Sequence, residues 1–541
     1  NNYAANNGNL TSVKYGNNAQ ISYTYDRFDR MITQTKAQGT YQYVYDAKSN
    51  LAYTKTPEGT TTYYTYDLAD RLAKVNDTSN NFTTSYTYDA NSNIDSAKYT
   101  LNNQSNEIQY TFDKNNRITN VKLNNNTNIV TNYDTLSRIS NKQLKVGTNT
   151  FTTQYIYENL GNNRTTTSIA SVTNGTNSIS YTYDELGNIE TITEGNALKA
   201  TYHYDEQNQL IREDNVELNK TITYTYDQGG NITAKTEYPY TTGELGTATK
   251  TTNYSYTNTN WKDQLTSYNG QSITYDAIGN PLTYNGNTYT WQNGRELAGI
   301  TNTEEGLSIS YNYNDDGIRT SKTVNGVTTR YHLEGTNVIY EKKDGSNDII
   351  YYSYDENGNI VGLKYNNTEY YYIKNLQGDI IGILDNNLQQ IVQYTYDSWG
   401  NPISIKDANG NEITDTTHIG IINPYRYRSY RYDTETGLYY LQSRYYNPEW
   451  GRFLNGDGYG GQIGGILTHN IYAYCLNNPI NNYDPDGDIA FAIPFIVGGI
   501  KDFILAAVGF AGGIAIGGTI IDNIKDNESS KAKSEPVTTT R

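Results

Sequence analysis

Tyrosine alternates with threonine or another small residue along most of the chain, and most of these runs end in aspartate. In Tyr181-Thr182-Tyr183 the two rings are two residues apart, so on a β-strand both point to one face and the threonine points to the other. The alternation therefore predicts strands with one buried tyrosine face. Copies of this Tyr-x-Tyr-Asp motif, with near variants, end at Asp26, Asp46, Asp67, Asp89, Asp113, Asp134, Asp184, Asp205, Asp227, Asp276, Asp355 and Asp397, and degenerate copies end at Glu158 and Asn314.

A turn sequence follows the aspartate in each copy. Leu-Gly-Asn occupies residues 186–188, and the aliphatic Ile189 comes next. Asp and Asn side chains bond nearby backbone in turns, and Gly adopts positive φ without strain. Each repeat is thus predicted to be a hairpin that buries its tyrosine face only when neighbours stack on it. Because open twisted sheets rarely exceed about ten strands, so many hairpins are expected to form a sheet that curls on itself.

Composition narrows the class of protein. The 57 tyrosines against 9 phenylalanines predict rings that are buried with a partner for each hydroxyl. The regular spacing favours this internal ladder over a carbohydrate-binding platform of exposed tyrosines. A net charge of -16 argues against a nucleic-acid-binding surface on the shell. Cys475 is the one cysteine and there are four histidines, so we expect neither a disulfide nor a zinc site, and no cofactor.

The repeats resemble a known family. YTYDANSNI (residues 86–94), YTYDELGNI (181–189) and YSYDENGNI (352–360) are similar to the YD repeats of the RHS family, which includes bacterial polymorphic toxins and is related to the teneurins and to the shell of the Tc-toxin C component. The resemblance covers residues 12–487. It implies an all-β fold: a spiralled antiparallel β-sheet shell, hollow inside, that encloses a C-terminal polypeptide.

The most specific resemblance lies in residues 424–487. YDTETGLYYLQSRYYNPEWGRFL (432–454) and NIYAYCLNNPINNYDPDG (470–487) resemble the RHS repeat-associated core. In that family two D-P-x-G motifs supply the aspartates of an intramolecular aspartyl protease that cuts just past the second motif. Carried across, these aspartates are Asp457 and Asp484, and the cleavage region is Gly487 and Asp488.

Two nearby carboxylates can share a proton, which separates their pKa values into one acid and one base. This chain departs from the family pattern at Gly456, where Arg is common, at Gly458, where Pro is usual, at Asp488, where Leu is usual, and in the wider gap between the motifs. Both motifs are also ordinary turn sequences. Enzyme activity is therefore left open, with self-cleavage as the one candidate reaction. A Cys-His pair at Cys475 and His469 is disfavoured, since the family match places this segment in core packing.

The composition changes sharply after residue 488. Residues 489–524 are apolar and rich in glycine, and 525–541 are polar. The stretch from Phe503 to Ile521 has no charged residue and has about the length that crosses a bilayer as a helix. Gly509, Gly513 and Gly517 are four apart, which places them on one helix face. This segment is either a membrane-permeabilising toxin, a segment folded inside the shell, or the junction before a toxin that this sequence does not contain.

The expected organisation is a repeat shell over residues 1–423, a plug over 424–487 and a variable C-terminal region over 488–541. The resemblance implies that the shell encapsulates and delivers its own C-terminal segment, with a cognate immunity protein, a secretion machinery and a target membrane as partners. It also implies a secreted or cell-surface location, although residues 1–10 show no signal peptide, and we interpret the chain as a piece whose N-terminus is missing. The alternative is a cell-surface adhesion or carbohydrate-binding protein.

Overall fold

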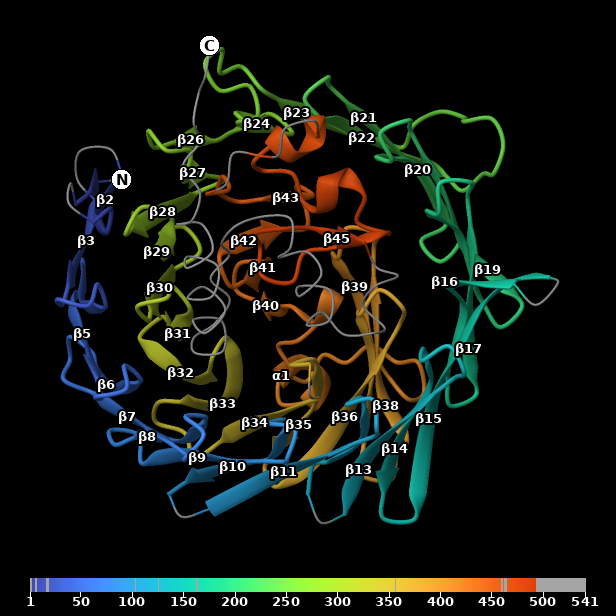
Figure 1. Cartoon of the computed structure of the whole chain (residues 1–541). Coiled ribbons are helices and arrows are strands. Elements are labelled where there is room, and N and C mark those ends of the chain that lie inside the picture. The colour runs from blue at the N-terminus through green and yellow to red at the C-terminus, as the bar shows by residue number, and fades with distance from the viewer. Residues whose placement is uncertain are drawn as a thin grey trace, which may run out of the picture.

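Consecutive strands pair antiparallel in two long meanders (Figure 1). The first sheet has 25 strands, from β1 (Asn2–Tyr3) to β25 (Gln271–Ser272), and the second has 14, from β26 (Thr274–Tyr275) to β39 (Pro402–Asp407). This computed structural model describes residues 2–492 except 5–6, 16–18, 103, 125, 162–163, 356, 459–460 and 462–464. The all-β, spiralled antiparallel shell predicted from the repeats is confirmed.

One repeat shows how the sequence builds the wall. In β17 (Asn177–Tyr183), Tyr181 is buried and Thr182 is exposed, as the alternation predicts. The carboxylate of Asp184 accepts hydrogen bonds from the backbone N–H of Leu186 at 2.9 Å and of Asn188 at 2.8 Å, which closes the turn before β18 (Ile189–Glu194). The aspartate is therefore a turn residue, and its carboxylate substitutes for backbone partners.

The second tyrosine of each motif links its repeat to the preceding one. In six copies from the middle and end of the shell, its hydroxyl donates to the carbonyl of an aliphatic residue 14 to 16 positions earlier. The predicted partners for buried hydroxyls are thus found in the wall itself. These bonds join Tyr183 to Ile169, Tyr204 to Ile189, Tyr226 to Leu210, Tyr313 to Leu297, Tyr354 to Val338 and Tyr396 to Ile380.

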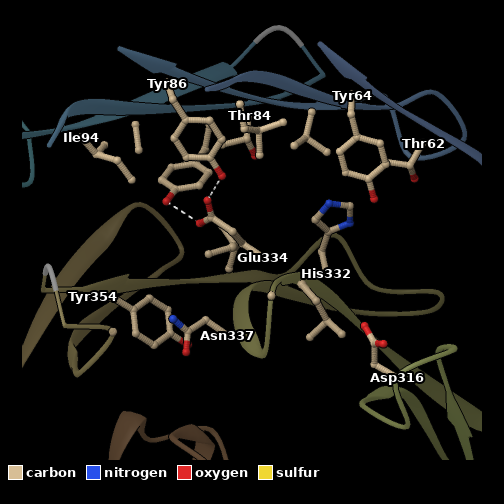
Figure 2. Close-up of a pocket in the computed structure, with 18 of the residues that line it drawn as sticks. Thr62, Tyr64, Thr84, Tyr86, Ile94, Asp316, His332, Glu334, Asn337 and Tyr354 are labelled. Atoms are coloured by element: carbon tan, nitrogen blue, oxygen red, sulfur yellow. Dashed lines mark hydrogen bonds between the residues drawn. The ribbon is translucent and has the colours of Figure 1, made fainter. Parts of the chain in front are cut away.

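The two sheets contact each other through acidic side chains of the second sheet. Tyr43 donates to a carboxylate oxygen of Asp315 at 2.5 Å, and both Tyr86 and Tyr99 donate to Glu334. Figure 2 shows Glu334 reaching from the second sheet toward Tyr86 on the first. These pairs lie beside a cavity of about 2360 Å³ that is lined by both sheets.

The plug sits inside the ring of strands (Figure 1). The short helix α1 (Ile419–Ile422) leads into it, and the plug itself contains η1 (Tyr427–Ser429) and a four-stranded sheet from β40 (Arg431–Asp433) to β43 (Arg452–Phe453). Two more short turns of helix, η2 (Ile466–His469) and η3 (Cys475–Asn477), precede the pair β44 (Asn482–Tyr483) and β45 (Phe491–Ala492).

Buried ion pairs fasten the plug to the shell. Asp433 of the plug contacts Arg319 at 2.5 Å and Lys322 at 2.9 Å, both on β31 (Arg319–Val324). Burial alone would raise the pKa of Asp433, but these two cations hold it well below its usual range. Arg428 and Arg431 of the plug similarly meet the shell's Asp379 and Glu341.

Most of the apolar tail, from residue 493 on, lies outside the described residues. Phe503, Gly509, Gly513, Gly517 and Ile521 lie outside the described residues, so the predicted membrane segment stays a prediction. Within the residues that the structure describes, no helix has both the length and the apolar character needed to cross a membrane.

We expect Asp433→Asn to lower the free energy of unfolding by roughly 3–5 kcal/mol, because it leaves Arg319 and Lys322 buried without their anion. Urea unfolding followed by near-ultraviolet circular dichroism measures the change. The control is Asp344→Asn, whose pair with Arg330 at 3.1 Å is exposed and should contribute less than about 1 kcal/mol. Equal effects of the two substitutions would show that the buried pair does not anchor the plug.

Candidate active site

The candidate site forms around a hairpin in the plug. Strands β41 (Leu438–Leu441) and β42 (Arg444–Asn447) are joined by a tight turn, and Arg444 is the first residue after it. The side chain of Arg444 is buried, and its guanidinium lies 3.6 Å from the ring centroid of Phe453. The hairpin therefore fixes one cation in the interior of the plug.

The two predicted aspartates meet at this guanidinium. Nη2 of Arg444 is 3.0 Å from Oδ2 of Asp457 and 3.7 Å from Oδ2 of Asp484. Nε of the same side chain donates to the carbonyl oxygen of Gly487, and Nη1 donates to the carbonyl of Ile471 at 3.1 Å. The structure thus brings both aspartates and the proposed cleavage region to one cation.

The segment from Asp484 to Asp488 is held against the hairpin. The N–H of Gly487 donates to Oδ1 of Asp484 at 2.9 Å, and the hydroxyl of Ser443 donates to the carbonyl of Asp486 at 2.8 Å. Gly487 has a φ of +86°, and a Cβ there would lie 2.7 Å from Oγ of Ser443. Only glycine adopts this positive φ without strain and also leaves room for Oγ of Ser443. Residue 487 therefore fixes how closely the loop approaches the hairpin.

Burial makes the carboxyl groups of this loop weak acids. Burial is the main reason that the pKa of Asp484 is raised to about 7; Arg444 acts to lower this pKa, and the neighbouring Asp486 and Asp488 act to raise it. Burial, with the charge of Asp486, raises the pKa of Asp488 to about 6, and the pKa of Asp486 is also raised, mainly by burial. The site therefore keeps protons on carboxyl groups near neutral pH, next to a fixed positive charge.

Three residues of this site were not predicted from the sequence: Arg444, Ser443 and Asp486. Arg444 stands in the R-Y-Y-x-P part of the quoted signature, directly before Tyr445 and Tyr446, both of which are buried. A basic residue inside a run of core aromatics was the available signal, because a buried arginine needs anionic partners.

The structure gives no support to Cys475 as a nucleophile. Cys475 is buried and burial raises the pKa of its thiol, whereas a nucleophilic cysteine needs a lowered pKa. Among the described residues, no group of three or more His, Cys, Asp or Glu side chains has the arrangement of a metal site.

Solved structures with the same architecture are multiprotein complexes. The TcdB2-TccC3-Cdc42 structure superposes with a TM-score of 0.58 at 19% sequence identity, over 91% of this chain and 28% of that chain. The TcdB2-TccC3 structure gives a TM-score of 0.56 at 20% identity, over 89% of this chain and 28% of that chain. At this level of identity the likeness shows the fold.

Sequence relatives include proteins named as nucleases and toxins. The tRNA3(Ser)-specific nuclease WapA of Bacillus spizizenii is 39% identical over 288 residues, which is 52% of this chain and 12% of that protein. The tRNA nuclease WapA of Bacillus subtilis strain 168 is 40% identical over the same shares. The toxin protein Tse5 of Pseudomonas aeruginosa is 46% identical over 74 residues, 14% of this chain and 5% of Tse5. The chain thus spans about an eighth of the WapA nucleases.

The family model described as RHS Repeat matches residues 6–41. The same hairpin unit then recurs through both sheets of the shell. The match identifies residues 6–41 as an RHS repeat, and the hairpin units that follow extend the same architecture through the shell.

Proposed function

We propose that this chain is the shell and plug of a toxin-delivery protein, which encloses its own segment 488–541 and releases it by cutting the plug after Gly487 or Asp488. The observation that carries the cleavage step is the position of Arg444. One guanidinium contacts Asp457, Asp484 and the carbonyl oxygen of Gly487. The bond between residues 487 and 488 therefore starts at a carbonyl that is already hydrogen-bonded to a buried cation.

The contacts suggest how the bond would be hydrolysed. Water adds to the carbonyl carbon of Gly487, and the negative charge that develops on its oxygen is stabilised by Arg444. The Asp457 carboxylate accepts a proton from the attacking water. The Asp484 carboxyl, whose pKa of about 7 leaves it largely protonated below neutral pH, gives a proton to the departing nitrogen of Asp488. The products are a carboxylate at Gly487 and a free amine at Asp488.

This arrangement differs from a pair of aspartates that share one proton directly. Here both carboxylates contact the same nitrogen of Arg444, so the cation couples them. The difference in their environments supports separate roles, because Asp457 is the closer partner of Arg444 while Asp484 is the more deeply buried acid.

Enclosure is supported by the hollow between the two sheets and by the plug within the ring of strands (Figure 1). The relatives named as toxin and nuclease support a toxin-related role for the enclosed segment. We extend the proposal to a secreted or surface-bound protein, with a secretion machinery and a cognate immunity protein as partners.

Purified full chain is expected to split into a large body and a fragment of 54 residues (488–541), or 53 if the cut follows Asp488. Denaturing gels and intact mass spectrometry measure both products. Asp484→Asn should leave the chain whole because the proton donor is lost, and Asp344→Asn, at an exposed pair, should be cut as the parent is. Persistent cutting in Asp484→Asn would contradict the assignment.

Refolding from urea turns cleavage into a timed reaction. Arg444→Lys is expected to slow it by roughly 10²–10³-fold, because a lysine cannot hold both carboxylates and the Gly487 carbonyl together. The matched control, Arg330→Lys, should cut at the parent rate.

The cleavage rate of the parent chain should fall as pH rises through 7, because Asp484 loses its proton there. A rate that climbs above pH 7 would argue against Asp484 as the acid.

Enclosure is tested separately with trypsin. Lys501, Lys525 and Lys531 lie in the segment proposed to be enclosed, and they should resist digestion in the native chain. Asp433→Asn, which breaks a buried anchor of the plug, should expose them, as followed by mass spectrometry over time. Rapid cutting at these lysines in the native chain would place the segment outside the shell.

A further inference from the structure

A second, smaller cavity of about 620 Å³ lies between the shell and the plug. Its walls are β19 (Ala197–Tyr204) of the first sheet, β38 (Gln390–Tyr396) of the second and η1 of the plug. The exposed hairpin-turn residues Asn177, Glu217 and Ala408 line one end, so this end meets solvent. The volume falls in the range of small-molecule sites in proteins.

A buried polar atom along this cavity lacks a protein partner. Oε1 of Gln377 has no hydrogen-bond partner among the described residues, although this side chain is only 3% exposed. The hydroxyl of Ser398, which is 7% exposed, also lines the cavity and lies against Glu213 and Tyr202. Buried polar groups in native proteins are nearly always hydrogen-bonded, so the Gln377 oxygen points to a bound molecule or to ordered water.

The layer behind Ser398 is polar. The carboxyl of Glu213 lies against Ser398, and the hydroxyl of Tyr224 lies against Trp399, all of them buried. Burial is the main reason that the pKa of Glu213 is raised to about 7, so near neutral pH this group offers a donor as well as an acceptor. A ligand at Ser398 would therefore meet a polar layer rather than an apolar one.

Most charged groups of the cavity have an oppositely charged partner, and the carboxylate of Asp407 instead accepts from the backbone N–H of Asn409 and the amide of Asn411. Asp379 pairs with Arg428 at 3.1 Å, and Glu194 pairs with Lys199 at 2.8 Å. Asp397 lies 3.7 Å from Lys235. These pairs leave no strong demand for an ionic ligand, and they favour one that is neutral and rich in hydrogen-bonding groups.

Aromatic surface completes the lining. Tyr181 and Tyr202 come from the first sheet, Tyr394 from the second and Tyr427 from the plug. Tyrosine combines an apolar ring with a polar tip, so the wall offers apolar patches next to hydroxyls, amides and carboxyls. A sugar has the matching surface, because its C–H faces suit rings and its hydroxyls donate and accept.

We propose that this cavity binds a neutral polyhydroxylated ligand of mono- or disaccharide size, with Gln377 and Ser398 as its main hydrogen-bonding partners. This site is independent of the self-cleavage proposed above. Because Tyr427 belongs to the plug and Tyr202 to the shell, an occupant contacts both bodies. Binding would therefore also stabilise the docked plug.

The test titrates the full chain with glucose, galactose, N-acetylglucosamine, maltose and sucrose, and follows calorimetric heat and tryptophan fluorescence, for which Trp399 is the local reporter. At least one sugar is expected to bind saturably and to raise the melting temperature. Ser398→Ala and Gln377→Ala should each weaken that binding by about tenfold, the factor that one lost hydrogen bond of about 1.4 kcal/mol represents. Ser272→Ala and Gln271→Ala, on exposed β25, are the matched controls and should bind as the parent does.

Two results would overturn the proposal. One is the absence of saturable binding for every sugar in the panel while the parent chain is folded by circular dichroism, which would assign the partner of the Gln377 oxygen to ordered water. The other is sugar binding of unchanged affinity in Ser398→Ala and Gln377→Ala, which would place the sugar elsewhere. Neither result depends on whether the chain cuts itself, because Asp484→Asn protein can be titrated in the same way.

Discussion

The shell depends on one repeated hydrogen bond, from the second tyrosine of each motif to a carbonyl in the preceding repeat. Tyr204, for example, donates to Ile189, the residue that begins the returning strand of the repeat before it. A buried hydroxyl without this partner would cost stability, so neighbouring hairpins must keep one register. The bond explains why tyrosine, and not the equally apolar phenylalanine, stands at the second position in most copies of the motif. It also holds the aspartate turns of the bonded repeats at corresponding ends of their hairpins.

Once the turns are aligned, each aspartate meets the side chain four residues later. In one early turn Asp134 pairs with Arg138 at 2.7 Å, and that arginine stacks on the Tyr157 ring of the next repeat. Turns that meet the plug carry amides at this position. Asn478 of the plug donates to Asn188, and Asn477 donates to Gln209 at 2.9 Å. An amide both donates and accepts without a charge to desolvate, so it suits a buried turn better than an ion pair does.

Local patterns predicted the strands, the turns and the buried tyrosine face, because each arises within one or two repeats. Contacts between distant repeats could not be read in the same way. Glu334 accepts from Tyr86 and Tyr99, more than 230 residues earlier, and nothing near it in the sequence marks that partnership. At the candidate site, Asp457 and Asp484 came from family resemblance, whereas Arg444 depends on how the hairpin folds back over the loop. Neither the alternation nor the turn chemistry specifies that approach.

The departure from the family motif at Gly456 fits the packing around it. An arginine there would require Ile471 to shift, because even a Cβ would lie 2.8 Å from Cδ1 of Ile471. The space beside it is already used by the shell's Arg295, whose guanidinium donates to the Gly456 carbonyl at 2.7 Å. The cation at the aspartates is instead Arg444, which enters from the hairpin. Two buried carboxylates need a compensating charge, and this chain supplies it from a different backbone position. The unusual glycine is therefore compatible with the chemistry proposed for Asp457 and Asp484, since the charge an arginine there would bring is already present.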